Sequence, residues 1–232
     1  MALNAELTAA VKKTFKEEWT KREGVVVPES EDIGLGNEAV LLDATVLYAD
    51  LAGSTAMVQS TTQSFSAEVY KTYLYCAARI VRSEGGAITA YDGDRIMAVF
   101  IGESRNTSAA RCGLKINYAV REIINPAIAA QYPKTDFRMR QVVGVDSSSL
   151  WVARTGVRGA NDLVWVGRAA NYAAKLTEID DGHPTWITAE VYNKLNKSTK
   201  VSRDGRDMWE RRSWNAMGGA TVYRSSWWWR ID

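Results

Sequence analysis

Several kinds of residue and segment are scarce in this chain, and each scarcity excludes a class of protein. Among 232 residues there are only two cysteines, Cys76 and Cys112, and one histidine, His183. Both cysteines fall in segments with helical spacing, and no apolar signal segment follows the polar N-terminus, which indicates free thiols in a reducing cytoplasm. No apolar run approaches the roughly 20 residues that a transmembrane helix needs. The sequence therefore predicts a soluble, cytoplasmic protein with no membrane insertion.

An excess of charge of one sign is also lacking. The chain has 29 basic and 27 acidic residues and a formal net charge of +2, so composition gives no electrostatic argument for binding nucleic acid or an anionic membrane. A polyanionic ligand would have to be held by local chemistry. Tryptophan, in contrast, is abundant, with nine residues. Several lie near the C-terminus, where we expect core or interface strands rather than a ligand cage: Trp209, Trp214, Trp227, Trp228 and Trp229.

The length suits one sizeable domain with an N-terminal appendage. Leu7, Val11, Phe15 and Trp19 recur at four-residue spacing, which predicts an amphipathic helix over about residues 4–22 that ends at Gly24. The stretch 25–39 carries proline, glycine and acids and has the composition of a linker. We therefore divide the chain into a helix and linker at 1–40 and a domain at 41–232.

The rest of the chain alternates strand and helix patterns. A strand over 44–50 precedes a helix over about 64–84, a hairpin around Asp92-Gly93, and a helix over 106–124 that stops near Pro126. Strands at 139–149, 150–156 and 163–167, a helix that begins near Gly167, and two aromatic strands at 207–214 and 221–229 complete the pattern. This order predicts an α+β fold, a ferredoxin-like split βαβ core with extra C-terminal strands.

Two acids stand at corresponding places in this pattern. Asp50 ends the first core strand, and Asp94 begins the strand that leaves the hairpin turn. Because these strands are neighbours in a split βαβ sheet, both carboxylates can converge on one edge. Carboxylates that close repel each other unless a cation or a proton neutralises them, and Mg²⁺ or Mn²⁺ suits such oxygen ligands. Each acid alone also has a local explanation, since Asp50 could cap a following helix and Asp92-Gly93-Asp94 could be only a turn.

Three separated motifs, YADLAGST, YDGDRIMAVF and VGRAANYAAKL, resemble the catalytic core of the class III nucleotidyl cyclases over roughly residues 44–190. The resemblance implies that Asp50, the adjacent Leu51 and Asp94 hold two divalent metal ions. It also implies that the backbone of the loop after Asp50 binds the triphosphate, through Ala52, Gly53, Ser54 and Thr55.

The third motif implies a dimer. In the family this motif supplies an asparagine that orients the ribose and, four residues later, an arginine that stabilises the transition state, both from the opposite subunit of a head-to-tail dimer. Asn171 occupies the first position, but Lys175 occupies the second. Lysine offers charge without the bidentate fork of arginine, so Arg168, Arg154 or Arg158 could supply the guanidinium instead. The alternative is that Asn171 and Lys175 only form a solvated helix face.

The positions that read the base depart from the purine cyclases. Where those enzymes carry a lysine and an acid or small polar residue, this chain has Ala90 and Val164, which cannot bond to a purine edge. Tyr48, Tyr91 and Trp165 flank these positions and would narrow the pocket to one ring. This departure, the N-terminal helix and the closing SSWWWRID resemble the pyrimidine cyclases of bacterial Pycsar anti-phage systems.

That resemblance implies conversion of UTP to 3′,5′-cyclic UMP and pyrophosphate as a second messenger that acts on a separate effector protein. Three alternatives stay open: a cytidylate cyclase, an adenylate or guanylate cyclase with an altered pocket, and a nucleotide-binding regulatory domain without turnover. The sequence does not identify the residues that read the base, the activating trigger or the effector. His183, in an Asp-Gly-His-Pro turn, is expected to be a surface residue and not a catalyst.

Overall fold

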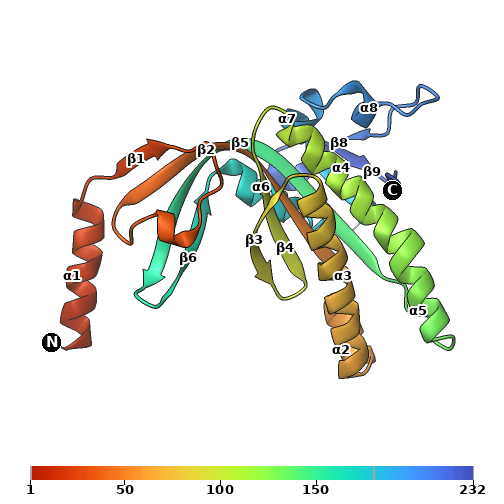
Figure 1. Cartoon of the computed structure of the whole chain (residues 1–232), viewed down its shortest axis with the longest axis horizontal. Helices are drawn as coiled ribbons and strands as arrows, with labels where there is room; N and C mark the ends of the chain where they lie inside the picture. Colours follow the sequence, from red (N-terminus) through yellow and green to blue (C-terminus); the bar gives the residue numbers. More distant parts are fainter. Residues whose placement is uncertain (1, 180, 232) are drawn as a thin grey trace. The chain divides into compact units, whose positions relative to one another are not determined.

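The computed structural model describes residues 2–179 and 181–231, and its internal contacts group them into two units (Figure 1). The first unit comprises the described residues up to Asp43 together with Ser149–Gly167. The second unit comprises Ala44–Ser148 and the described residues from Arg168 onward. Strands β2 (Glu38–Ala52) and β5 (Arg140–Val157) each contribute to both units. The domain boundary near residue 40 stays a prediction.

The first unit consists of a helix and short pairings at the outer ends of these two strands. Helix α1 (Leu3–Lys16) has no buried residue, and strand β1 (Thr20–Glu23) runs parallel to the start of β2, with Thr20 opposite Glu38. A 3₁₀ turn, η1 (Ser30–Asp32), lies between them, and β6 (Ala160–Val166) pairs antiparallel with the end of β5.

The helix predicted to reach residue 22 ends at Lys16 in the structure, so the prediction was too long. The Asn37 side chain donates to the carbonyl oxygens of Thr14 and Glu17, at 2.8 Å each, and so satisfies acceptors at the helix end. The chain then extends because residues 20–23 pair with β2, a partner that helical spacing cannot reveal. The predicted linker also contains η1 and the first residues of β2.

The second unit is a sheet with helices on both faces. Its strands lie in the order β3-β4-β2-β5-β7-β9-β8. The strands not yet located are β3 (Ala87–Asp92), β4 (Arg95–Phe100), β7 (Thr185–Thr188), β8 (Glu210–Trp214) and β9 (Ala220–Ser225). The helices are α2 (Ser54–Ser60), α3 (Gln63–Ser83), α4 (Arg105–Tyr118), the π-helix η2 (Ala119–Ile124), α5 (Asn125–Gln131), α6 (Arg168–Leu176), α7 (Ala189–Asn193), α8 (Lys197–Lys200) and the 3₁₀ turn η3 (Asn215–Met217). The first four strands of that order form the predicted split βαβ core.

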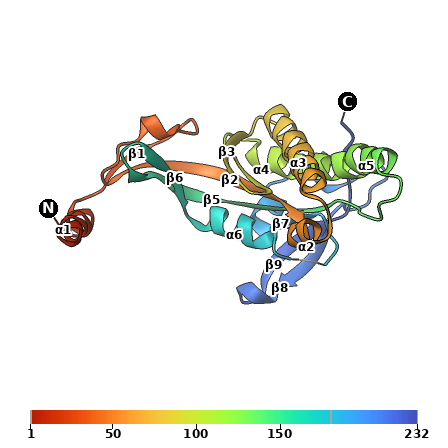
Figure 2. The ribbon, with the colours of Figure 1, turned by 90° about the horizontal axis from the view of Figure 1, so that it is seen from below.

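Helices α3, α4 and α5 lie on one face of this sheet and α6 lies on the other (Figure 2). The apolar face predicted for the long helix is buried, as Phe65, Val69, Tyr73 and Ala77 on α3 show. On the opposite face the backbone of α6 packs directly on β5, because a Cβ at Gly144 would lie 2.1 Å from the carbonyl oxygen of Ala173. The sequence pattern thus places both helical layers on the sheet.

Three local predictions for this unit are wrong. The chain stays helical through Pro126, because the π-helix η2 directly before this residue changes the helix register and so accommodates a residue without an N–H. The strands expected at 139–149 and 150–156 are one strand, β5. Strand β9 ends at Ser225, so Trp227, Trp228 and Trp229 lie outside strands, although the Trp229 N–H donates to the Leu114 carbonyl at 3.0 Å.

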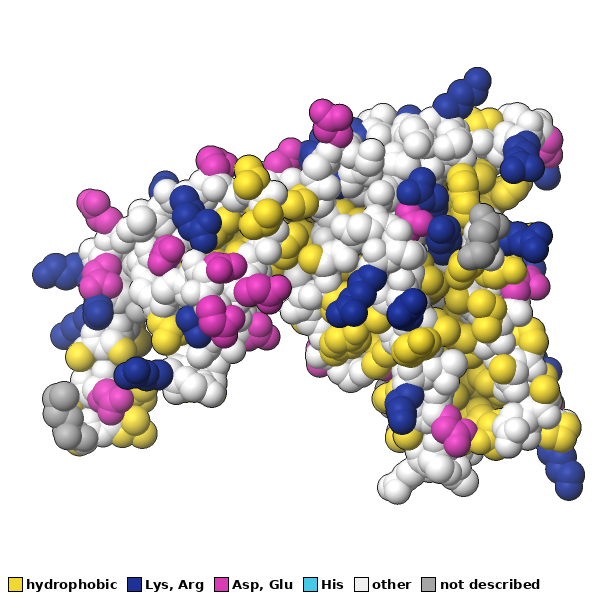
Figure 3. All heavy atoms as spheres, in the orientation of Figure 1, with side chains coloured by type: hydrophobic (Ala, Val, Ile, Leu, Met, Phe, Trp, Pro, Cys, Tyr) yellow, Lys and Arg dark blue, Asp and Glu magenta, His cyan; other side chains and the backbone are white. Residues whose placement is uncertain are grey.

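Both signs of charge occur on the surface. Several acidic side chains lie close together on the left half of the face in Figure 3, with basic side chains around them and on the right half. Within the part of the chain that the structure describes, no helix has both the length and the apolar character needed to cross a bilayer.

Candidate active site

Asp50 lies near the end of β2 and is held by an arginine. Its side chain is 20% exposed, and Arg95 on the neighbouring strand β4 contacts Oδ2 through Nε at 3.2 Å and through a terminal nitrogen at 3.0 Å. The residue at the N-cap of helix α2 is Gly53, which has no side chain that could form a capping hydrogen bond. Asp50 is therefore a strand residue that faces a cation, and it is not the N-cap of α2.

Asp94 lies in the turn between β3 and β4, as the hairpin pattern predicts. Gly93 before it has φ 61°, a left-handed conformation that favours glycine. The Oδ2 atom of Asp94 is buried and has no hydrogen-bond partner in the structure. A buried carboxylate oxygen without a partner destabilises the fold, so this atom indicates a position where a bound ligand would stabilise it.

The two acids influence each other electrostatically. Burial raises the pKa of Asp50, and the charge of Asp94 raises it further, while the Arg95 guanidinium opposes both. This coupling means that Asp50 and Asp94 lie close enough for one charge to disfavour the other. A divalent cation would relieve both the repulsion and the unpaired Asp94 oxygen, so the residues present fit a metal site. Among the described residues no cluster of three or more histidine, cysteine, aspartate or glutamate side chains occurs, so further ligands would have to be backbone or substrate oxygens.

Two residues beside these acids were not predicted from the sequence. Arg95 holds Asp50 and lies over the ring of Tyr48, 5.9 Å from its centroid. The Tyr73 hydroxyl on α3 is buried without a hydrogen-bond partner in the described part of the chain, and its pKa is raised well above the usual value by burial and then by the charges of Asp50 and Asp94. Arg95 directly follows Asp94 in the second motif, which was a signal for it, whereas Tyr73 was identifiable only as a core residue.

The predicted phosphate loop has the expected backbone. Ala52 is the last residue of β2, Gly53 has φ 74°, and α2 begins at Ser54. The left-handed glycine turns the chain sharply between strand and helix. Ala52 and Ser54 are partly buried, whereas Gly53 and Thr55 are exposed, so the backbone here is accessible to a ligand. Phosphate binding by this loop stays a prediction.

Asn171 and Lys175 lie on the exposed side of α6. They share one face because they are four residues apart, while Ala169, Ala173 and Leu176 are buried on the other. The Lys175 ammonium lies 3.9 Å from the sulfur of Met217. This geometry leaves both polar groups available to a ligand, and it also fits the alternative that they only form a solvated helix face.

The arginines offered as substitutes for the missing guanidinium have other contacts. Arg168 contacts the buried carboxylate of Asp146 at 3.0 and 3.2 Å and the Ser147 carbonyl at 2.7 Å. Arg154, in the first unit, donates to the Asn161 side chain at 2.7 Å. Arg158 is exposed. Lys175 is thus the cation on α6 whose side chain makes no ion pair with any acid among the described residues.

The residues expected around the base fall into both units. Tyr48 is half-buried, Ala90 lies at an irregularity of β3, and Tyr91 is 57% exposed, all in the second unit. Burial raises the pKa of the Tyr48 hydroxyl, Arg95 lowers it, and Asp92 raises it. Val164, 40% exposed, and Trp165 belong to β6 of the first unit. Their convergence on one pocket stays a prediction.

Comparison with known proteins gives the family. No family model matches the chain. A uridylate cyclase from Xanthomonas perforans is 54% identical over 233 residues, which is 100% of both chains. A uridylate cyclase from Burkholderia cepacia is 56% identical, also over 100% of both chains, and one from Rhodovulum sp. (strain MB263) is 38% identical over 98% of each. The chain belongs to the uridylate cyclase family.

Solved structures show the fold of this uridylate cyclase family member. The adenylyl cyclase CyaB from P. aeruginosa is 18% identical, with a TM-score of 0.68 over 84% of this chain and 96% of that one. The guanylyl cyclase Cya2 is 18% identical, with the same TM-score over 82% and 94%. A class III adenylyl cyclase-like ATP-binding protein from Pseudomonas aeruginosa gives 0.65 at 16% identity, over 86% of this chain and 45% of that one. The α+β fold of a nucleotidyl cyclase catalytic domain is confirmed.

Proposed function

We propose that this protein is a uridylate cyclase, which converts UTP to 3′,5′-cyclic UMP and pyrophosphate. The 3′-hydroxyl oxygen attacks the α-phosphorus, the bond from that phosphorus to the bridging oxygen of the β-phosphate breaks, and the hydroxyl proton is lost. The observation that carries the proposal is the coupled pair Asp50 and Asp94, in which a buried Asp94 oxygen has no hydrogen-bond partner among the described residues. The match to named uridylate cyclases along the whole chain supports it.

The acids and the glycine loop form the half of the site that holds the triphosphate. Asp50 and Asp94, with the Leu51 carbonyl, would hold divalent metal ions, two in number by the resemblance and either Mn²⁺ or Mg²⁺. Such ions lower the pKa of a bound hydroxyl and neutralise phosphate charge. Arg95, which contacts Asp50, is positioned to keep that carboxylate oriented. Backbone N–H groups from Ala52 to Thr55 would bind phosphate oxygens.

The α6 residues form the other half. Asn171 offers an amide to the ribose hydroxyls, and Lys175 offers a positive charge to the phosphorus centre as negative charge develops there. We propose that both reach the metal half across a homodimer interface, so that each site is built from two chains. Tyr48 and Tyr91 would limit the pocket to a pyrimidine, with Ala90 unable to bond to a purine edge.

In the cell, we infer, cyclic UMP made by this protein acts as a second messenger in anti-phage defence, in the cytoplasm, on a separate effector protein. The relatives named uridylate cyclase support the formation of cyclic UMP, and the resemblance to the Pycsar pyrimidine cyclases suggests the role in defence. A cytidylate cyclase is the second candidate, because the aromatic residues around the predicted pocket limit its size without distinguishing uracil from cytosine.

The test is to incubate purified protein with Mn²⁺ and each of UTP, CTP, ATP and GTP, and to identify cyclic product by mass spectrometry. We expect cyclic UMP from UTP, and a loss of at least about a hundredfold in Asp94→Asn, which removes a carboxylate charge and keeps the side-chain shape. Conversion of CTP alone would favour the second candidate. Product from ATP or GTP, or none from any nucleotide, would contradict the proposal.

A further inference from the structure

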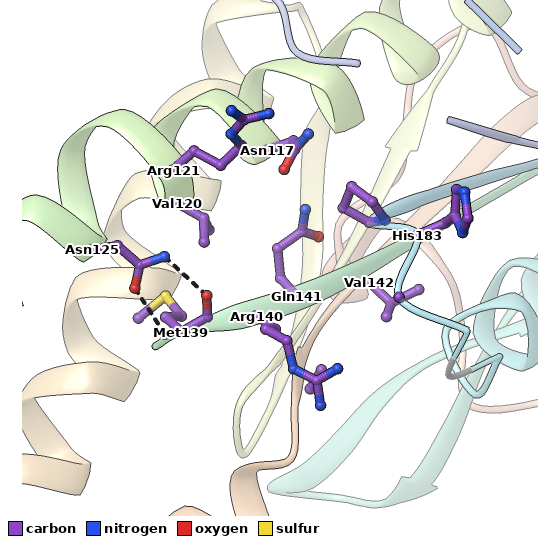
Figure 4. Close-up of a pocket in the computed structure, with 12 residues that line it drawn as sticks. Asn117, Val120, Arg121, Asn125, Met139, Arg140, Gln141, Val142 and His183 are labelled. Atoms are coloured by element: carbon purple, nitrogen blue, oxygen red, sulfur yellow. Dashed lines mark hydrogen bonds between the residues drawn. The ribbon is translucent and has the colours of Figure 1, made fainter. Parts of the chain in front are cut away.

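A cavity lies in the second unit, between η2 and the first residues of β5 (Figure 4). Its volume is about 160 Å³. Arg95, Asn171 and Lys175 do not line it, and of the residues placed in the proposed active site it includes Ala52 alone. Its walls include Asn117, Val120, Arg121, Met139, Gln141 and Pro184.

The side-chain amide of Gln141 lines the cavity. Gln141 is 3% exposed, and neither its Oε1 nor its Nε2 atom has a hydrogen-bond partner among residues 2–179 and 181–231. Its side chain extends from β5 toward the helix that carries Asn117 and Arg121 (Figure 4). Buried side-chain amides are nearly always paired, and one that is unpaired at both ends destabilises the fold unless something else occupies those positions.

The neighbouring polar groups are arranged so that they do not satisfy Gln141. The amide nitrogen of Asn117 donates instead to the carbonyls of Ser226, at 3.3 Å, and Trp227, at 2.8 Å. The Asn125 side chain holds both backbone groups of Met139, accepting from its N–H at 2.8 Å and donating to its carbonyl at 3.0 Å (Figure 4). This clamp fixes η2 and α5 to the start of β5, so the cavity has firm walls.

One wall is a π-helix and carries a cation. The wider turn of Ala119–Ile124 interrupts the helix here, a feature that is frequent at functional sites. Arg121 projects from it, with a half-exposed side chain that lies over the Trp228 ring at 4.2 Å and pairs with Glu122 at 3.8 Å. Val120, Met139 and Pro184 supply apolar surface beside it.

We propose that this cavity binds a pyrimidine nucleotide, with the base edge on Gln141 and the phosphate at Arg121. The amide presents an acceptor and a donor side by side, which complements the N3–H and O4 of uracil. A cavity of this volume suits one six-membered ring, since about 150 Å³ accommodates benzene. Ribose and phosphate would then lie at the mouth, near the guanidinium. Neither the reaction proposed above nor its site requires this second site.

The cavity touches the strand that carries Asp50. Ala52, which lines the cavity, is two residues from Asp50 on β2, and β2 is the neighbour of β5 in the sheet. An occupant bonded to Gln141 would therefore contact both strands at the end where the proposed metal ligand lies. If the proposed function is right, occupancy of this site depends on the concentrations of the pyrimidine nucleotides that the reaction consumes and forms.

The experiment measures binding without turnover. Uridine, UMP, cyclic UMP and AMP are titrated calorimetrically into the full chain in EDTA. We expect uridine, UMP and cyclic UMP to bind, AMP not to bind, and Gln141→Leu to weaken UMP about tenfold or more because it removes both hydrogen bonds. The control, Asn171→Ala, should bind UMP as the wild type does, which separates this site from the proposed catalytic one.

Two further readouts distinguish a ligand site from a structural amide. Gln141→Leu should melt at or above the wild-type temperature, because leucine has no polar atom to leave unpaired. Arg121→Ala should weaken UMP and leave uridine unchanged. The proposal is overturned if no probe binds, if Gln141→Leu binds UMP as tightly as the wild type, or if it melts well below the wild type. Since no step needs catalysis, these outcomes are independent of whether the protein makes cyclic UMP.

Discussion

At the scale of single residues, the carboxyl group of Asp50 couples stability to pH. Burial, reinforced by Asp94, raises its pKa above the ordinary value of 3.8. The folded protein therefore holds this proton at pH values where the unfolded chain has lost it, so the contribution to stability is present at low pH and is lost as pH rises above 3.8 through the folded-state pKa. The proposed metal ligand is one that opposes folding once it is ionised.

Asp50→Asn should remove this dependence. Urea unfolding in EDTA between about pH 4 and 7 should show the variant gaining free energy of unfolding relative to the wild type as pH rises, because asparagine never ionises. Asparagine keeps an acceptor for Arg95, so the comparison isolates the charge. Two curves that stay parallel across this range would show that the Asp50 proton does not influence folding.

The same residues show what a sequence can and cannot reveal at this scale. Asp50 and Asp94 were identifiable because each ends or begins a strand and because two motifs repeat a family pattern. Tyr73 and Gln141 were not, since one occupies an ordinary position on a helical apolar face and the other lies inside a strand pattern. Their unpartnered buried atoms become visible only when the neighbouring elements are in place.

At the scale of elements, the contact between α6 and β5 positions Asn171 and Lys175. A Cβ at Gly144 would lie 2.1 Å from the Ala173 carbonyl oxygen and 2.7 Å from the Leu176 Cβ, distances that require α6 to move. Gly144→Ala should therefore cost about 1–3 kcal/mol of unfolding free energy through overpacking. It should also reduce cyclase activity at temperatures where the protein remains folded, because a small displacement of catalytic groups is costly.

Gly36→Ala provides the matched control for that substitution. Gly36 has open space around the position of a Cβ, so this variant should have the melting temperature and the initial rate of catalysis of the wild type. Thermal melts and initial rates on both variants make the comparison. A Gly144→Ala protein with unchanged stability and activity would contradict the packing argument.

The elements themselves were predictable where hydrophobic periodicity decides the structure. The buried face of α3 and the hairpin at Gly93 follow from spacing and turn chemistry. Helix α1 was overextended because pairing with β2 claims residues 20–23, and Pro126 was misjudged because a π-helix precedes it. These errors share a cause, since distant partners and helix register outweigh local preference.

At the scale of the whole molecule, one chain carries both halves of the proposed site. In the proposed site, Asp50 on β2 and Asp94 in the β3–β4 turn would serve the triphosphate, and Asn171 on α6 would serve the ribose. In a symmetric homodimer with shared sites, a heterodimer of Asp50→Ala and Asn171→Ala chains contains one intact site and one doubly damaged site. Each variant alone should be inactive, whichever half it lacks.

Co-expression of Asp50→Ala with Asn171→Ala should therefore restore activity that neither variant has alone. Equal expression and random pairing make half of the dimers mixed, with one working site in two, so we expect about a quarter of the wild-type rate. The control pair, Asp50→Ala with Asp94→Ala, damages the metal half in every site and should stay inactive. A mixture of Asp50→Ala and Asn171→Ala that forms heterodimers yet remains inactive would mean that each chain completes its own site, because only then does every site carry a lesion.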